Sequence, residues 1–296
     1  MNDLRTLRAT LTPDEPSQDV VDRSRHRLQN RMLSGPKPRK RVGLLTVGAG
    51  LTAAAIAAAV VVVASPGAPG PQGVVPAVTA GNVLLAAATA AERAPAGSGA
   101  YWYVKVTVAS LPTHSQDVYE YWTSADGRTL WFRGAKSGGR VEQLTLARTG
   151  FSLGVVTVTL DQLQGLPTDP AALRAWLVTA VEKSGTRTSA GPPTASDREL
   201  FVLQTLISLV STTPAPPQIR AAAFRAIAAY PGVRELGAVP GGQGLMLPEG
   251  VRLVVDPATG RVNKTSMYMS VDGGAHYTDD PDGAAISADW TDVLPE

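Results

Sequence analysis

The side chains that could perform acid–base chemistry or bind a metal are few and widely separated in this 296-residue chain. Its histidines are His26, His114 and His276, and it has no cysteine, which excludes a thiol nucleophile and a thiolate metal site. His114 lies in a predicted loop and His276 beside a Gly-Gly pair, and both positions are typical of surface residues. The nucleophile-elbow, phosphate-loop and zinc-protease motifs are absent from the sequence. We therefore predict no catalytic residue, no metal site and no cofactor, and a protein that is not an enzyme.

Two short polar segments resemble ligand sites at first sight. Asp279, Asp280 and Asp282 offer carboxylates that Ca²⁺ could use, but they lack the spacing and the closing glutamate of an EF-hand loop. The sequence Asp-Pro-Asp-Gly is also ordinary turn chemistry. Residues 241–244 (GGQG) could be mistaken for a phosphate loop, yet no helix is predicted after them. Turns are favoured in both places.

The tryptophans offer a different kind of site. Trp102, Trp122, Trp131 and Trp290 fall on predicted strands, and Trp176 falls on a predicted helix. One interpretation is packing within the core and the sheet. The other is the lining of an apolar cavity between a curved sheet and its helices, which would take a lipid or another hydrophobic ligand. The candidate cavity residues are Trp102, Trp122, Trp131 and Trp176.

The elements that must position these side chains follow from periodicity and turn chemistry. The predicted strands are residues 101–108, a hairpin at 118–134 that turns at Asp126-Gly127, and residues 141–148, 155–163, 233–239, 244–247, 251–256, 261–271 and 285–294. The predicted helices are residues 82–93, 166–185, 196–210 and 216–233. We expect an α+β fold, because strands precede and follow a block of helices, with an antiparallel sheet that carries helices on one face.

Helix ends are also marked in the sequence. Asp169 is the expected N-cap of the second predicted helix, Pro170 its first residue, and Gly185 lies past its end. Ser196 and Glu199 have the spacing of a capping box at the start of the third predicted helix.

A membrane-spanning helix is predicted at residues 42–64, from Val42 to Ala64. These residues contain no charged, proline or amide side chain, and a helix of this length covers about 34 Å, which suits a bilayer core. The basic residues just before it are Lys37, Arg39, Lys40 and Arg41. They predict a cytoplasmic N-terminus and an extracytoplasmic C-terminal part in the cell membrane. A cleaved signal peptide and a buried alanine-rich helix are less consistent with the length and polarity of the segment.

The first 41 residues carry ten Lys and Arg against five Asp and Glu, so the rest of the chain has a charge of about −3. This distribution argues against direct nucleic-acid binding by the folded domain. Within the tail, Val21, Leu28 and Met32 lie on one side of a predicted amphipathic helix. The tail is either a solvated basic anchor that touches anionic lipid or a helix that docks on a cytosolic protein.

The chain therefore divides into four parts. They are a basic cytoplasmic tail (1–41), a transmembrane helix that acts as a signal anchor (42–64), a linker rich in proline and glycine (65–80) and an extracytoplasmic α+β domain (81–296). The linker at 65–80 is identified by its proline and glycine content alone.

Three segments carry a family resemblance. Residues 166–177 (LPTDPAALRAWL), 216–233 (PPQIRAAAFRAIAAYPGV) and 253–262 (LVVDPATGRV) resemble an uncharacterised family of actinobacterial single-pass membrane proteins. The resemblance covers the chain from the tail to about Val262, and the more polar residues after Val262 depart from the pattern. Members are often encoded beside sigma factors of the extracytoplasmic-function type, which implies an anti-sigma-like or sensory role.

The resemblance also implies an architecture. The outer domain of the family is similar to the half-barrel of lipoprotein carriers and of lipid-holding mycobacterial lipoproteins, in which helices cross the concave face of a curved antiparallel sheet. The zinc motif of anti-sigma proteins is absent here, because the chain has no cysteine. We expect a non-enzymatic envelope sensor or anti-sigma-like regulator whose tail binds a sigma factor. The alternative is a membrane-tethered carrier of a lipid or hydrophobic ligand.

Overall fold

The computed structural model of the chain describes residues 79–110, 115–146, 149–278 and 280–295. The predicted tail, membrane-spanning helix and linker up to residue 78 lie outside these residues. None of the helices within the described part is long and apolar enough to cross a bilayer.

The chain alternates between sheet and helix in three blocks. The first helix and the strands after it are α3 (Ala80–Arg93), β1 (Tyr101–Ser110), β2 (Ser115–Ser124), β3 (Thr129–Arg133), β4 (Glu142–Thr145), β5 (Phe151–Ser152) and β6 (Thr157–Val158). The helical block comprises α4 (Leu160–Gln164), α5 (Pro170–Lys183), α6 (Ala195–Ser211) and α7 (Pro217–Ala228). The remaining strands are β7 (Arg234–Val239), β8 (Gly242–Met246), β9 (Arg252–Asp256), β10 (Arg261–Thr265), β11 (Met267–Met269), β12 (Ala275–Tyr277) and β13 (Ala284–Thr291). Two 3-10 turns, Ala135–Ser137 and Pro248–Gly250, complete the list.

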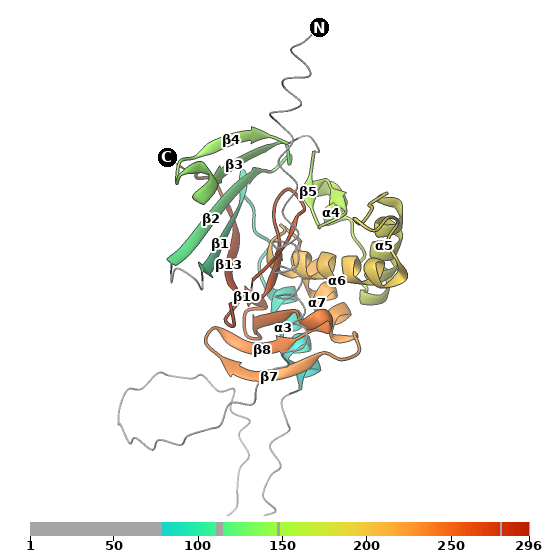
Figure 1. Cartoon of the computed structure of the whole chain (residues 1–296). Coiled ribbons are helices and arrows are strands. Elements are labelled where there is room, and N and C mark those ends of the chain that lie inside the picture. The colour runs from blue at the N-terminus through green and yellow to red at the C-terminus, as the bar shows by residue number, and fades with distance from the viewer. Residues whose placement is uncertain (1–78, 111–114, 147–148, 279, 296) are drawn as a thin grey trace, which may run out of the picture. The chain divides into compact units, whose positions relative to one another are not determined.

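Nine of these strands form one antiparallel sheet in the order β4-β3-β2-β1-β13-β10-β9-β8-β7. The last strand of the chain, β13, lies in the middle of this sheet, where it joins β1 to β10. Strand β1 pairs with β13 from Tyr101 opposite Thr291 to Thr107 opposite Ala285. Figure 1 shows the helices gathered on one side of the sheet, with β3 and β4 at one end and β7 and β8 at the other.

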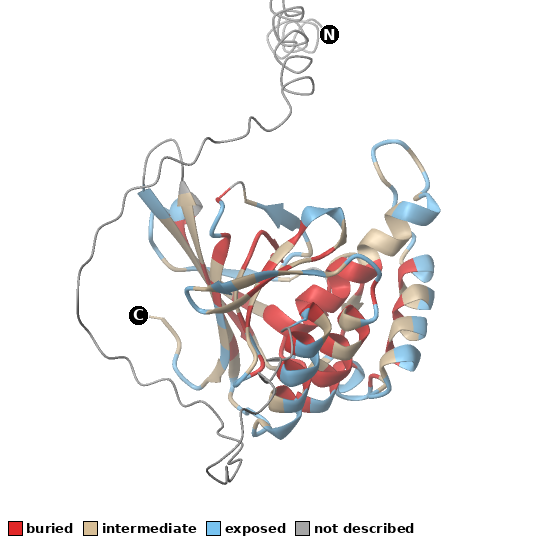
Figure 2. Cartoon of the chain, turned by 90° about the horizontal axis from the view of Figure 1, so that it is seen from below, coloured by how far each residue is buried: buried red, intermediate tan, exposed pale blue. Residues whose placement is uncertain are grey.

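The helices pack on the sheet through apolar faces. Helix α7 contacts α3, α5 and α6, and α6 also contacts β10, β11 and β13. Every residue of α6 from Val202 to Ser211 is buried, and Figure 2 shows buried residues concentrated in these helices. At the β9–β10 turn, Gly260 has a φ of +65°, and a Cβ there would lie 2.5 Å from the carbonyl oxygen of Ala87 on α3. A glycine is therefore required where this turn meets the helix.

The buried apolar residues form two separate clusters. The helix core joins α3, α5, α6 and α7 to the inner face of β8–β10, where Leu245, Leu253 and Val255 are fully buried. The β1/β13 core is smaller and centres on Trp102, Val104, Val106 and Ile286, with Phe151 and Tyr268 packed against them. The sheet is continuous, whereas its hydrophobic core is divided.

The predicted α+β class with a large antiparallel sheet and several helices is confirmed. The hairpin at Asp126-Gly127 is also confirmed, as are the Asp169 cap, which accepts from the Ala172 amide, and Pro170 as the first residue of α5.

Two local predictions are wrong. Residues 155–163 were expected to form one strand, but only Thr157–Val158 do, and α4 begins at Leu160 because Thr159 and Gln162 form a capping box. The cap of α6 is Thr194, which forms a capping box with Asp197, rather than Ser196 with Glu199. In both places a threonine caps a helix at a position that the apolar pattern does not indicate.

Candidate functional site

A hollow of about 580 Å³ lies where the two cores meet. Its walls come from β1 and β13, from the α6–α7 connection, from α4 and from the segment that follows α3. Residues of the β1/β13 core line one side (Trp102, Leu160, Ala288 and Trp290), and Ala215 of the helix core lines the other. The hollow is open to solvent at Pro95, Gly97 and Thr259, and its volume is within the range of small-molecule sites.

The apolar wall is built around two tryptophans. Trp102 is buried, and its indole Nε1 donates to the carbonyl oxygen of Thr212 at 2.8 Å, which fixes the ring against the end of α6. Trp290 packs edge-to-face on Trp102, with ring centroids 5.4 Å apart. A Cβ on Gly97 would lie 2.7 Å from Cδ1 of Trp290, so the chain at Gly97 packs closely on this ring. The prolines of the α6–α7 connection complete a rigid surface without side-chain donors.

Arg220 lies in the first turn of α7 and also lines the hollow. A smaller adjoining hollow of about 60 Å³ shares Trp102, Arg220, Arg261 and Ala288 with it. The Nε of Arg220 is buried and has no hydrogen-bond partner among the described residues. Burial lowers the pKa of Arg220, Arg261 adds a smaller effect in the same direction, and Asp289 opposes both. The side chain remains charged, because an arginine does not lose its proton in a protein.

Two hydroxyls that line the smaller hollow with Arg220 donate to backbone carbonyl oxygens of α6. Ser211 Oγ donates to the carbonyl oxygen of Ile207 at 2.6 Å, and Thr213 Oγ1 donates to that of Ser208 at 3.1 Å. At the rim of the larger hollow, Arg261 Nη2 lies 2.8 Å from Asp289 Oδ2, and both side chains are more than half exposed. The site therefore combines an apolar wall, one half-buried cation without a partner among the described residues, and one cation in a solvated ion pair.

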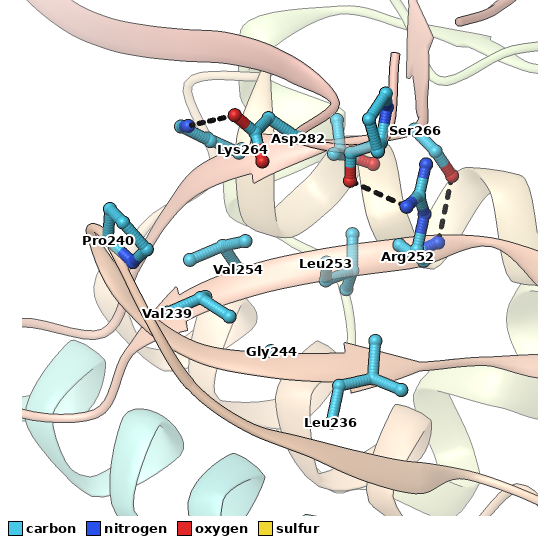
Figure 3. Close-up of a pocket in the computed structure, with 12 residues that line it drawn as sticks. Leu236, Val239, Pro240, Gly244, Arg252, Leu253, Val254, Lys264, Ser266 and Asp282 are labelled. Carbon is cyan, nitrogen blue, oxygen red and sulfur yellow. Dashed lines mark hydrogen bonds and ion pairs between the residues drawn. The ribbon is translucent and has the colours of Figure 1, made fainter. Parts of the chain in front are cut away.

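A second hollow lies on the opposite face of the sheet, over β7–β10. It encloses about 90 Å³ between Leu236, Val239 and Val254, with Arg252 and Lys264 beside it (Figure 3). The guanidinium of Arg252 donates to the carbonyl oxygens of Pro281 and Asp280 at 2.5 and 2.8 Å. Arg252 therefore fastens the β12–β13 connection to β9.

A third hollow of about 610 Å³ lies between α5, α6, α7 and the turn at 248–250. Its cation, Arg174, is 2.6 Å from Glu199 and stacks over the ring of Tyr230 at 5.5 Å. Burial raises the pKa of Tyr230, and Glu199 adds to the effect, so the phenol stays neutral. Arg174 is already paired with Glu199, and the other charged residue of the lining is Glu249, so this hollow offers a ligand no unpaired cation.

The structure separates the four candidate cavity tryptophans. Trp102 lines the hollow between the cores. Trp122 and Trp131 are paired with each other on the other face of the sheet, since Trp122 lies opposite Tyr103, the next residue along β1. Trp176 is on α5 and packs against the helix core. The cavity prediction therefore narrows to Trp102, because alternate strand residues point to opposite faces.

The other predicted site residues lie outside the described part of the chain. They are Val21, Leu28 and Met32, Lys37, Arg39, Lys40 and Arg41, and the segment from Val42 to Ala64. His276, on β12, stacks on Tyr268 with centroids 5.2 Å apart. Asp280 and Asp282 form part of a turn closed by the Gly283 amide, which donates to the carbonyl oxygen of Asp280. Within the described residues, no three His, Asp or Glu side chains are grouped as metal ligands.

Sequence reasoning missed Arg220, although a signal was present. Ala223, Phe224 and Ile227 follow it at i+3, i+4 and i+7, and all three are buried. An arginine at the head of such a stripe must lie on the helix face that packs inward. Arg261 and Asp289 could not have been paired from the sequence, because they are 28 residues apart on neighbouring strands.

Comparisons of the chain with protein-family models, with curated proteins and with solved structures found no match. The resemblance carried by residues 166–177, 216–233 and 253–262 remains a prediction.

Proposed function

We propose that the described domain binds a small hydrophobic or amphiphilic ligand in the hollow between its two cores, and that residues 42–64 tether the domain to the outside of the cell membrane. The observation that carries the proposal is the hollow of about 580 Å³ against Trp102 and Trp290. A single-chain lipid would bury its tail on these rings and on the prolines of the α6–α7 connection. In this proposal the sheet and its helices form the half-barrel that the family resemblance implies.

The test replaces two alanines of β13 with phenylalanine, one in the site and one outside it. Ala288 faces the hollow, and Ala285 is on the opposite face of the same strand, opposite Thr107. Full-length protein in nanodiscs would be exposed to a photoactivatable long-chain alcohol, and labelled peptides would be quantified by mass spectrometry. We expect Ala288→Phe to reduce labelling of the peptides that contain Trp102 and Ala215 about tenfold, because the new ring fills the hollow. Equal labelling of wild type, Ala288→Phe and Ala285→Phe would reject the proposal.

A second candidate function is regulation through the tail. It rests on the local charge of +5 and on the apolar side formed by Val21, Leu28 and Met32. In this view the domain senses a ligand and the tail holds a cytosolic sigma factor. Residues 1–41 used as bait should capture a sigma factor, and the double substitution Val21→Asp, Leu28→Asp should abolish capture. Failure of the wild-type tail to capture one would leave it as an anchor.

A further inference from the structure

The ligand proposed above can be assigned a charge from the groups that line its site. Arg220 presents a buried Nε with no partner among the described residues. A buried donor without a partner destabilises the folded state, and more so when it belongs to a charged group. The Nε is covered by protein atoms, so an occupant with acceptor oxygens would use the other guanidinium N–H groups of Arg220, which lines both hollows.

Among the described residues, no carboxylate forms an ion pair with Arg220, although Asp289 is close enough to act on its charge. Asp289 is the one carboxylate among the residues that line the two adjoining hollows, and it is engaged with Arg261 at 2.8 Å. The nearby Ser211 and Thr213 hydroxyls donate to carbonyl oxygens of α6. The first turn of α7 adds positive potential, since its N-cap is Pro216 and no side chain caps it. The part of the site beside Arg220 is therefore cationic, while the walls around Trp102 and Trp290 are apolar.

We propose that Arg220 binds the acidic head group of a single-chain amphiphile whose apolar tail lies against Trp102 and Trp290. The inference rests on the proposed function and specifies its ligand class. The hollow of about 60 Å³ beside Arg220 would hold about four water-sized groups, which suits a carboxylate or a phosphate. A guanidinium binds either anion in a bidentate fashion. Arg261 at the rim would stay with Asp289 and contribute a weaker attraction.

The test compares three photoactivatable probes that share one C16 chain and end in a carboxylate, a phosphate or an alcohol. Full-length protein in nanodiscs would be labelled with each, and the peptides around Trp102 and Arg220 quantified. The variants are Arg220→Met, which keeps the volume and loses the charge, and Arg220→Lys, which keeps the charge. Arg225→Met is the matched control, because Arg225 lies on the same helix in an ion pair with Glu92 outside the site.

We expect at least one acidic probe to label the wild-type site about tenfold or more above the alcohol. Arg220→Met should reduce acid labelling to the level of the alcohol, Arg220→Lys should retain part of it, and Arg225→Met should behave as wild type. Preference for the carboxylate would identify a fatty acid, and preference for the phosphate a lysophospholipid-like head group.

Different outcomes separate the inference from the function on which it rests. If all three probes label the site equally and Arg220→Met changes nothing, the site binds a ligand and the assignment of an acidic head group is wrong. If no probe labels these peptides, the proposed function itself fails.

A thermal melt distinguishes loss of binding from misfolding, since removal of an unpaired buried donor should leave the melting temperature of Arg220→Met unchanged or higher. A lowered melting temperature with loss of all labelling, alcohol included, would mean that Arg220 is structural and would overturn the inference.

Discussion

Strands β7–β10 lie under a layer of helices, whereas strands β1–β4 carry much of their apolar surface as aromatic rings on both faces of the sheet. In the first region the inner face is aliphatic and fully buried, and it packs on α3 and α6. In the second region the rings contact each other: Tyr103 and Trp122 are tilted, as are Tyr121 and Phe132, and Tyr101 meets Trp131 edge-to-face, with centroids 4.9–5.3 Å apart. The edge strand β4 is exposed along its whole length.

The two regions of the sheet therefore gain stability from different sources. Burial from water dominates under the helices, where large side chains are completely covered. Ring contacts and a polar network hold the other region: Glu120 accepts from the Tyr103 hydroxyl at 2.6 Å and lies 2.8 Å from Arg133, whose guanidinium stacks over Trp122. A polar network on a sheet face responds to pH, and an aliphatic core does not. The hollow lies at the boundary, where neither kind of packing fills the space.

The largest expected effect is the difference in stability lost when a phenylalanine is removed from each of the two regions. Phe224 on α7 is fully buried in the helix core, and Phe132 on β3 is partly exposed against Tyr121. We expect Phe224→Ala to lower the free energy of unfolding by about 3–5 kcal/mol, because it leaves a cavity. Phe132→Ala should cost about 1–2 kcal/mol, since solvent can replace part of the lost contact. Pulse proteolysis in urea on the full-length protein measures both values. Equal losses would mean that β1–β4 are packed as tightly as the helix layer.

The next effect is a pH dependence confined to the aromatic region. Burial raises the pKa of Glu120, but hydrogen bonds from Tyr103 and Arg133 and the charge of Arg133 outweigh it, so the pKa lies below its usual 4.5. The stabilisation is therefore complete above about pH 4.5 and is lost as pH falls through the lowered pKa of the folded state. Glu120→Gln should cost about 1–2 kcal/mol at neutral pH and flatten the decline in stability below about pH 4.5.

The control for this effect is Glu142→Gln on β4, which makes the same charge change at an exposed position. It should leave both the stability and its pH profile close to those of the wild type. Urea titrations at several pH values compare the three proteins. An unchanged acid limb in Glu120→Gln would show that the network does not contribute to the stability of β1–β4.

Local chemistry made much of this fold predictable. The alternation of Trp102, Val104 and Val106 predicts a strand with one buried face, and Asp126-Gly127 and Asp169-Pro170 mark a hairpin and a helix start. These signals act within a few residues, so a sequence window contains them. The strand predicted at 155–163 is wrong because the apolar alternation there hides the capping box of Thr159 and Gln162. In the structure this capping box starts helix α4.

The placement of β13 and the composition of the site were not predictable in this way. Trp102 and Trp290 meet because β13 pairs with β1, and nothing near residue 290 encodes its partner among several strands. The same pairing brings Asp289 to the rim and separates Trp122 from Trp102. Arg220 becomes a binding candidate only when its buried Nε is seen to lack a partner. The tryptophans in the sequence indicate an apolar site, whereas the charge of that site depends on which residues the tertiary structure brings to it.

The smallest expected effect concerns Asp289 on β13, the strand that joins the two regions. Asp289 and Arg261 are 52–62% exposed in their ion pair, so Asp289→Asn should change the free energy of unfolding by less than about 0.5 kcal/mol. The substitution frees Arg261 and removes the one carboxylate from the site, so retention of an acidic C16 probe should rise about twofold to threefold. Asp282→Asn, which loosens the Lys264 pair on the opposite face of the sheet, is the matched control and should leave retention unchanged. A rise that disappears at high salt would locate the contribution of Arg261 in solvent at the rim, and a rise that persists would mean that Arg261 contacts the acidic head group together with Arg220.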